Sequence, residues 1–283
     1  MGKLIESLQR VGKSSGGGGI GFVGRAQAHT KPKAAGLIVT MSKPDAGQVE
    51  ALKKAGADAV IFALQIGKAG ASKAAPSLEP YADATAALRA ANLPWGLDLG
   101  AVVSSLQPEA IKTLREGGVD FVSFPLDAPA RLILERPEGL DRIVTLDAHR
   151  DDPYMLLARA VNLLSVQAVR FESAFSAASV QRLTIEDLLR LRILRETLRF
   201  PALVTIEGNL GSEEVRVLVK LGISGLLMQQ ETGESASALA ERVSALREEL
   251  ERVPSQESEE ETPNIGQFPG TSAKNEEQPN RER

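Results

Sequence analysis

"FPALVTIEGNLGSEEVRVLVKLGISGLLM", residues 200–228, contains a strand–helix–strand repeat, and this repeat decides the fold of the chain. Two short apolar runs, 203–207 and 225–229, have the composition of strands buried in a parallel sheet. Between them lies a segment with helical spacing, which Ser212 opens and Gly222 closes. The stretch therefore predicts two parallel strands joined by a helix.

Similar runs recur through the middle of the chain. The predicted strands are 37–40, 59–63, 95–99, 121–124, 142–146, 168–172, 203–207 and 225–229. Helical stretches alternate with them, and those at 45–56, 108–118, 184–199 and 211–222 have the clearest capping residues. Eight strands alternating with helices predict an α/β protein with a (β/α)8 barrel. A doubly wound open sheet is the alternative.

The glycine-rich stretch at 10–25 contains two sequences that look like phosphate loops. Residues 19–24 spell GxGxxG, but they precede the first predicted strand instead of following it. The Walker-like triplet 12–14 has Ser7 where the motif requires glycine. We therefore interpret residues 1–34 as an N-terminal helix and a flexible glycine linker, followed by the barrel at 35–253.

Composition limits the classes of function. The chain of 283 residues has no cysteine, which excludes disulfides, iron–sulfur clusters and thiolate zinc sites. The formal net charge of −4 argues against nucleic-acid binding. The mean hydropathy is −0.09, and neither a membrane span nor a signal peptide is predicted. We expect a cytoplasmic protein.

Residues 254–283 form an acidic C-terminal segment that accounts for the whole formal net charge. Ile265 and Phe268 are its only sizeable apolar residues, so we predict a disordered tail. The sequence "NIGQF" at 264–268 is either a short docking motif or part of a solubilising tail.

Barrel active sites form at the carboxyl ends of the strands. Alternation along the strands points one basic residue, Arg170, and four acids, Asp98, Asp147, Glu172 and Glu207, into the barrel. Clustered carboxylates are suited to acid–base catalysis or to binding a divalent metal. Alternatively, Arg170 is a structural counter-ion paired with Glu172 or Asp147.

Three other polar residues, His149, His29 and Lys68, lie outside the predicted strands. His149 follows Asp147 by two positions, so the pair is either a metal-binding or base motif, or His149 is a surface loop residue. His29 is expected to be exposed in the linker. Lys68 lies in a Gly-, Ala- and Lys-rich loop, 67–77, which is either a lid that meets an anionic substrate or a plain flexible loop. No predicted strand carries a lysine, which disfavours Schiff-base chemistry.

Residues 200–228, together with "AGADAVIF" at 55–62, resemble phosphate-binding (β/α)8 barrels. Examples are the indole-glycerol-phosphate synthase, phosphoribosyl isomerase and flavin-dependent barrel groups. The resemblance implies a phosphate bound by backbone N–H groups at Gly208, Asn209, Gly211 and Ser212. After the eighth strand, these families have a small glycine or serine step. This chain has 228–231, "MQQE", in its place, and Glu231 would repel a phosphate.

These observations predict a lyase- or isomerase-type enzyme acting on a small anionic, phosphorylated or unphosphorylated, substrate. Glu172 and Asp147 are the candidates for proton transfer, and Arg170 is the candidate for charge stabilisation. A divalent metal or FMN is left open as cofactor, and a homo-oligomer is compatible with the sequence. The alternative function is a catalytically inactive barrel that acts as a binding or assembly module.

Overall fold

The computed structural model describes residues 4, 6, 8, 33–42, 45–63, 78–100, 103, 108–134, 138–147 and 152–253. Eight parallel strands pair in chain order, and β1 also pairs with β8, which closes the barrel. The strands are β1 (Gly36–Met41), β2 (Ala59–Ala63), β3 (Trp95–Asp98), β4 (Phe121–Pro125), β5 (Asp141–Leu146), β6 (Ala168–Phe175), β7 (Ala202–Ile206) and β8 (Ile223–Gln229). The predicted (β/α)8 barrel is confirmed.

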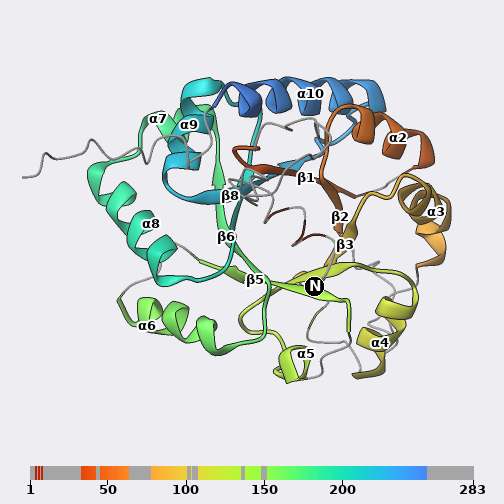
Figure 1. Cartoon of the computed structure of the whole chain (residues 1–283), viewed down its shortest axis with the longest axis horizontal. Coiled ribbons are helices and arrows are strands. Elements are labelled where there is room, and N and C mark those ends of the chain that lie inside the picture. Colours follow the sequence, from red (N-terminus) through yellow and green to blue (C-terminus); the bar gives the residue numbers. More distant parts are fainter. Residues whose placement is uncertain are drawn as a thin grey trace, which may run out of the picture.

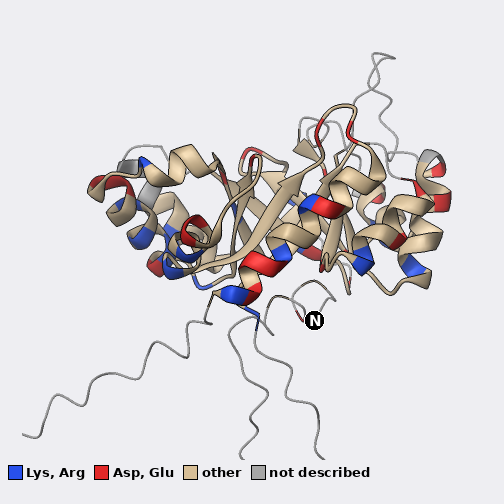
Figure 2. Ribbon diagram, turned by 90° about the horizontal axis from the view of Figure 1, so that it is seen from above, with Lys and Arg blue, Asp and Glu red and all other residues tan. Residues whose placement is uncertain are grey.

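Helices surround the barrel (Figure 1). The α-helices are α2 (Ala46–Lys54), α3 (Ala82–Ala90), α4 (Pro108–Glu116), α5 (Arg131–Leu134), α6 (Asp152–Ala160), α7 (Ala177–Gln181), α8 (Ile185–Thr197), α9 (Ser212–Lys220) and α10 (Ala236–Arg252). The described residues also form the 3-10 turns η1 (Glu79–Tyr81) and η3 (Val161–Leu163). In the side view, most charged residues lie on the helices and loops, and the strands are largely free of them (Figure 2).

Capping side chains begin several helices, as the sequence predicts. Thr184 accepts a hydrogen bond from the backbone N–H of Asp187, and the Asp187 side chain accepts one from the Thr184 N–H. This capping box satisfies N–H groups that have no partner within the helix. Asp45 and Gln48 form an equivalent capping box at the start of α2. These local contacts explain why the helix starts follow the sequence pattern.

Strand alternation separates two apolar cores. One core fills the space between the strands and the helices, and Trp95, Phe62 and Phe171 are among its largest fully buried members. The second core fills the lower barrel interior and contains Leu4, Leu8, Ile38, Ala59, Ile61, Phe121, Ile143, Ala168, Leu203 and Leu227. Because residues two apart point to the same face of a strand, the same alternation positions the polar side chains above this interior core.

The N-terminal residues Leu4 and Leu8 close the amino-terminal end of the barrel. Leu4, Glu6 and Leu8 are helical, and the two leucines are buried while Glu6 is exposed. A Cβ added at Gly36 would lie 2.7 Å from Leu8 Cδ2, and one added at Gly225 would lie 3.3 Å from it. Leu8 therefore packs where β1 and β8 begin, at the end of the barrel opposite the candidate site.

Candidate functional site

A polar layer lies above the interior apolar core. Arg170 Nη1 on β6 donates to Asp98 Oδ2 on β3 at 2.7 Å, and Arg170 Nη2 donates to Thr205 Oγ1 on β7 at 3.2 Å. Strands β3 and β6 are not neighbours in the barrel, so the first contact crosses the lumen. Ser123 and Thr145 add a hydroxyl pair 3.5 Å apart. The inward orientation predicted for Arg170 and Asp98 is confirmed.

The ion pair remains accessible from solvent. The side chains of Arg170 and Asp98 are 18% and 23% exposed. Among the described residues, Arg170 Nε is buried without a hydrogen-bond partner. Asp98 Oδ1 also accepts the Gly100 N–H at 3.2 Å, which fixes the carboxylate. The guanidinium is thus held in place while part of its surface remains available to a ligand.

The expected structural partners of Arg170 need a correction. The sequence interpretation paired a structural Arg170 with Glu172 or Asp147, both close to it in the alternation pattern. The structure pairs it with Asp98, 72 positions earlier in the chain. Closure of the barrel brings β3 within reach of β6, and strand alternation alone carries no information about contacts across the lumen.

Glu172 lies in an irregularity of β6. Phe171 pairs with Val204, but the next pair is Ala174 with Thr205, so Glu172 and Ser173 lie in a bulge. Glu172 is exposed. Bulges redirect side chains and are frequent beside active sites. Glu172 is therefore a solvent-accessible acid near the carboxyl end of the strand that carries Arg170.

Asp147 and Glu207 occupy equivalent positions at other strand ends. Asp147 follows β5 directly and is half-buried. Glu207 follows β7 and is exposed, and its backbone N–H donates to Phe175 O on β6 at 2.9 Å. Together with Glu172, these acids lie at the carboxyl ends of three consecutive strands. The closed barrel gathers them at the same end.

The predicted anion site at 208–212 already contains carboxylates of the chain. Gly211 N–H donates to Glu214 Oε2 at 3.0 Å, and the Ser212 hydroxyl donates to Glu249. Gln181 Nε2 donates to Glu214 Oε1 at 2.6 Å. The Gln181 hydrogen bond, followed by bonds from the backbone N–H groups of Glu214 and Gly211, lowers the pKa of Glu214 below its ordinary value of 4.5 and outweighs burial, which raises it. An ionised Glu214 therefore occupies the N-terminus of α9, and Gly208 and Asn209 are exposed beside it.

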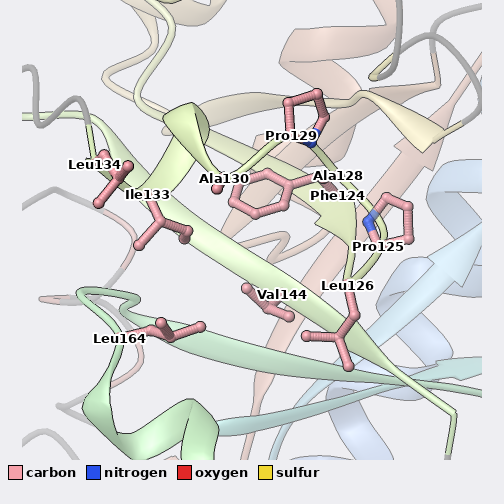
Figure 3. Close-up of a pocket in the computed structure, with 10 residues that line it drawn as sticks. All are labelled: Phe124, Pro125, Leu126, Ala128, Pro129, Ala130, Ile133, Leu134, Val144 and Leu164. Carbon is pink, nitrogen blue, oxygen red and sulfur yellow. The ribbon is translucent and has the colours of Figure 1, made fainter.

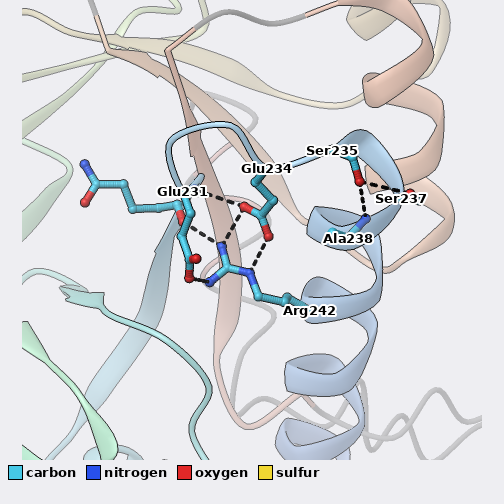
Figure 4. Close-up of polar contacts among 7 residues, drawn as sticks. Glu231, Glu234, Ser235, Ser237, Ala238 and Arg242 are labelled. Atoms are coloured by element: carbon cyan, nitrogen blue, oxygen red, sulfur yellow. Dashed lines mark hydrogen bonds and ion pairs between the residues drawn. The ribbon is translucent and has the colours of Figure 1, made fainter.

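The loop after β8 is held by Arg242 of α10 (Figure 4). The Arg242 guanidinium contacts Glu231 at 2.8 Å and Glu234 at 2.7 Å, and it also donates to the Gln229 carbonyl oxygen. Glu231 N–H donates to Glu234 Oε2 at 2.9 Å. This loop differs from the glycine or serine step of the phosphate-binding barrels, because two carboxylates and their arginine fill it.

Some predicted residues lie outside the described part of the chain. They are His29, Lys68 with its loop 67–77, and His149, together with the glycine linker and the tail 254–283. Within the described ranges, no group of three or more His, Asp or Glu side chains is placed to hold a metal ion. In the same ranges, no helix is both long and apolar enough to cross a membrane.

An apolar cavity on the outside of the barrel is a feature that sequence reasoning missed. It has a volume of about 240 Å³ and lies beside α5, which has a single turn (Figure 3). Its lining residues are Phe124, Pro125, Leu126, Ala128, Pro129, Ala130, Ile133, Leu134, Val144 and Leu164. The sequence signal for this cavity is the short segment between the fourth and fifth predicted strands. It holds a helix of only four residues, which is too short to cover the outer faces of both strands.

Comparison with solved structures identifies proteins of the same fold. The chain superposes on the tryptophan synthase α-subunit (E74A mutant) of Pyrococcus furiosus with a TM-score of 0.56 and 15% identity, covering 76% of this chain and 98% of that one. Thiamine phosphate pyrophosphorylase from Pyrococcus furiosus matches with a TM-score of 0.52 and 17% identity, covering 77% and 96%. The chain is a TIM barrel. No protein-family model and no curated protein sequence matches it.

Proposed function

We propose that this TIM barrel is an enzyme that performs acid–base chemistry, of lyase or isomerase type, on a small anionic substrate. The observation that carries the proposal is the Arg170–Asp98 pair across the lumen. A buried ion pair is seldom the most stable filling for a protein interior, and apolar side chains of similar volume do as well or better. A charged layer at the end of the barrel where such enzymes keep their sites therefore supports a chemical role.

Each residue has a role in this proposal. Arg170 binds the substrate and stabilises negative charge that develops on it, because its guanidinium is fixed before the reaction. Asp98 and Thr205 position Arg170. Glu172 is the general base, since it is exposed close to Arg170 in sequence, and Asp147 is the second proton-transfer group.

The proposed step is proton abstraction next to a carbonyl group. The C–H bond breaks, its proton goes to the Glu172 carboxylate, and its electron pair moves to the carbonyl oxygen, where Arg170 stabilises the charge. In an elimination, the electron pair returns to form a C=C bond, the bond from the next carbon to the leaving group breaks, and Asp147 transfers a proton to that group. In an isomerisation, the carbon that lost its proton carries a hydroxyl group. The hydroxyl proton moves to the first carbonyl oxygen, the new C=O bond forms at the carbon that carried the hydroxyl, and Asp147 transfers a proton to the former carbonyl carbon. Glu207 is kept as an alternative donor.

The binding group for the substrate anion differs from the one that the resemblance implied. Glu214 and Glu249 already accept hydrogen bonds from Gly211 and Ser212, and their negative charge opposes a phosphate there. We therefore assign the main anion contact to Arg170. Exposed Gly208 and Asn209 remain candidates for a second contact, and Lys68 remains a candidate from its loop.

Deuterium exchange tests the proposed function. Small oxo acids and sugar phosphates are incubated with the protein in deuterated water, and proton NMR measures exchange at carbons next to carbonyl groups. We expect exchange with the wild type and a loss of about 100-fold or more in Glu172→Gln. Glu241→Gln, an exposed site on α10, is the matched control and should exchange like the wild type. Equal exchange in both variants contradicts the role of Glu172.

A specific observation also favours the second candidate function, a binding or assembly module. The large apolar residues exposed among the described residues all lie between 134 and 193, on one side of the barrel. If the wild type exchanges no proton with any compound of the panel and binds none of them, the module becomes the better interpretation.

A further inference from the structure

One side of the barrel exposes large aliphatic residues on α5, α6, η3 and α8. The members of this apolar side are Leu134, Leu156, Leu157, Leu163, Ile185, Leu189 and Ile193, each at least 48% exposed. Helices α6 and α8 are neighbours in the ring (Figure 1). Asn162 ties η3 to the end of α8, since its side chain donates to Thr197 O and accepts from Arg199 N–H.

Large aliphatic residues exposed together on neighbouring elements often mark an interaction site. Seven aliphatic residues exposed to this extent offer apolar surface on the order of several hundred Å², and apolar patches of about this size on soluble monomers are often functional. A specific interface buries roughly 800 Å² on each partner. The apolar side is therefore large enough to form most of the core of such an interface.

Helix α8 has two apolar faces. Leu191 and Leu194 are buried against the barrel. On the opposite face, Ile185, Leu189 and Ile193 form an exposed seam with a spacing of four residues. A helix that only covers a barrel has polar residues on its outer face. The second face of α8 is thus suited to contact a partner.

The charges beside the seam favour one partner. Glu186 and Arg190 lie on the same flank of the seam, one turn apart, and form an ion pair of 2.9 Å within α8. If a second α8 runs antiparallel to the first, the flank is reversed, and Glu186 of each copy lies opposite Arg190 of the other. The flank is therefore complementary to itself.

The spacing of the seam fits the same arrangement. Seam residues lie about 6 Å apart along the helix axis. With a two-fold axis level with Leu188, the seam residues of one copy fall midway between those of the other. This interdigitation is the packing that stabilises antiparallel helix pairs.

We propose that a second copy of this chain docks on α8, which makes the protein a two-fold symmetric dimer. This inference does not depend on the proposed acid–base chemistry.

Sedimentation velocity between about 1 and 100 µM tests the dimer. We expect the full-length wild type to be dimeric and Leu189→Glu to be monomeric, because the substitution places a charge in the centre of the seam. Leu189 is 57% exposed, so the variant should still fold. Its circular dichroism spectrum should match that of the wild type, and it should unfold in one cooperative thermal transition. Ala86→Glu on α3, which lies on the other side of the barrel in Figure 1, is the matched control and should remain dimeric.

A charge swap tests the antiparallel register. Arg190→Glu should raise the dissociation constant by about tenfold, since it faces Glu186 of the second copy. Combining Glu186→Arg with Arg190→Glu should restore the wild-type constant to within about threefold. A monomeric wild type, a dimer that survives Leu189→Glu, or a swap that fails to restore association overturns the proposal. Loss of the dimer on removal of residues 254–283 also overturns it, because the occupant of α8 would then be the tail.

Discussion

Arg170 Nη1 lies 2.7 Å from Asp98 Oδ2, although the strands that carry these residues are separated by β4 and β5 in the barrel. The contact fixes a cation above an apolar interior made of residues such as Ile61, Phe121 and Leu203. Because Asp98 is the carboxylate bonded to Arg170, Arg170 does not depend on the acids at the ends of the neighbouring strands for an ion-pair partner. This division between the acid that positions Arg170 and the other acids at the strand ends has measurable consequences.

Asp98→Asn should destabilise the protein. The substitution removes the charge that compensates Arg170 in a partly buried layer, and it should lower the free energy of unfolding by about 1–3 kcal/mol. A urea melt measures the change. Asp127→Asn, an exposed loop position after β4, is the control and should change it by less than about 0.5 kcal/mol. Equal effects at both positions would show that Asp98 contributes no more than a surface carboxylate.

Glu172→Gln should leave stability nearly unchanged. Glu172 is exposed and Arg170 has Asp98 as its partner, so the loss should stay below about 1 kcal/mol. If Glu172 were a structural partner of Arg170, its loss would cost about 1–3 kcal/mol, as expected for Asp98. The same urea melt separates the two values. A loss in the higher range would assign Glu172 to the scaffold and remove it from the proposed proton transfer.

Leu8→Ala should weaken the closed end of the barrel. Leu8 is 2% exposed and packs at Gly36 and Gly225, so its truncation leaves a cavity. The expected loss is about 2–4 kcal/mol, read from the midpoint and slope of a denaturant transition. Glu6→Ala, on the exposed face of the same helical turn, provides the comparison and should be close to neutral. If the two variants melt alike, the N-terminal residues do not support the barrel.

Glu214 should make stability fall in acid. Its pKa is lowered in the folded state from its ordinary value of 4.5, chiefly by the Gln181 hydrogen bond. The unfolded chain then binds the proton more readily, so this contribution is fully present above the unfolded pKa. It is lost as the pH falls below 4.5 through the folded pKa. Thermal melts between pH 3 and 6 should show a flatter pH dependence for Glu214→Gln than for the wild type. Glu213→Gln, exposed in the same turn, should keep the wild-type profile.

The position of the candidate site follows from local sequence, but its internal contacts do not. Alternation predicts that Arg170 and Asp98 point inward, because side-chain direction depends only on neighbours along a strand. The bond between them depends on barrel closure and register. The bulge that displaces Glu172 depends on how β6 pairs with β7 beyond Phe171. Neither the Arg170–Asp98 bond nor the bulge can be predicted from a short stretch of local sequence.

The apolar side of the barrel shows the same limit. The amphipathic pattern of 184–199 predicts a helix, and α8 extends over Ile185–Thr197. The pattern does not show which of its two apolar faces the barrel covers, because Leu191 and Leu189 are equally apolar. Only the packing of α8 on the strands buries Leu191 and leaves Leu189 outside.

The sequence by itself determined the eight strands, the capped helices, their alternation, which favours a parallel barrel, and the end where polar residues gather. These properties rest on short-range physics, namely strand alternation, helix capping and the burial of apolar runs. The tertiary structure alone decided that Asp98 holds Arg170, that Glu214 occupies the start of α9, and that one side of the barrel remains apolar. Each of these outcomes requires groups distant in sequence to meet, and their positions are set by closure and packing of the whole chain.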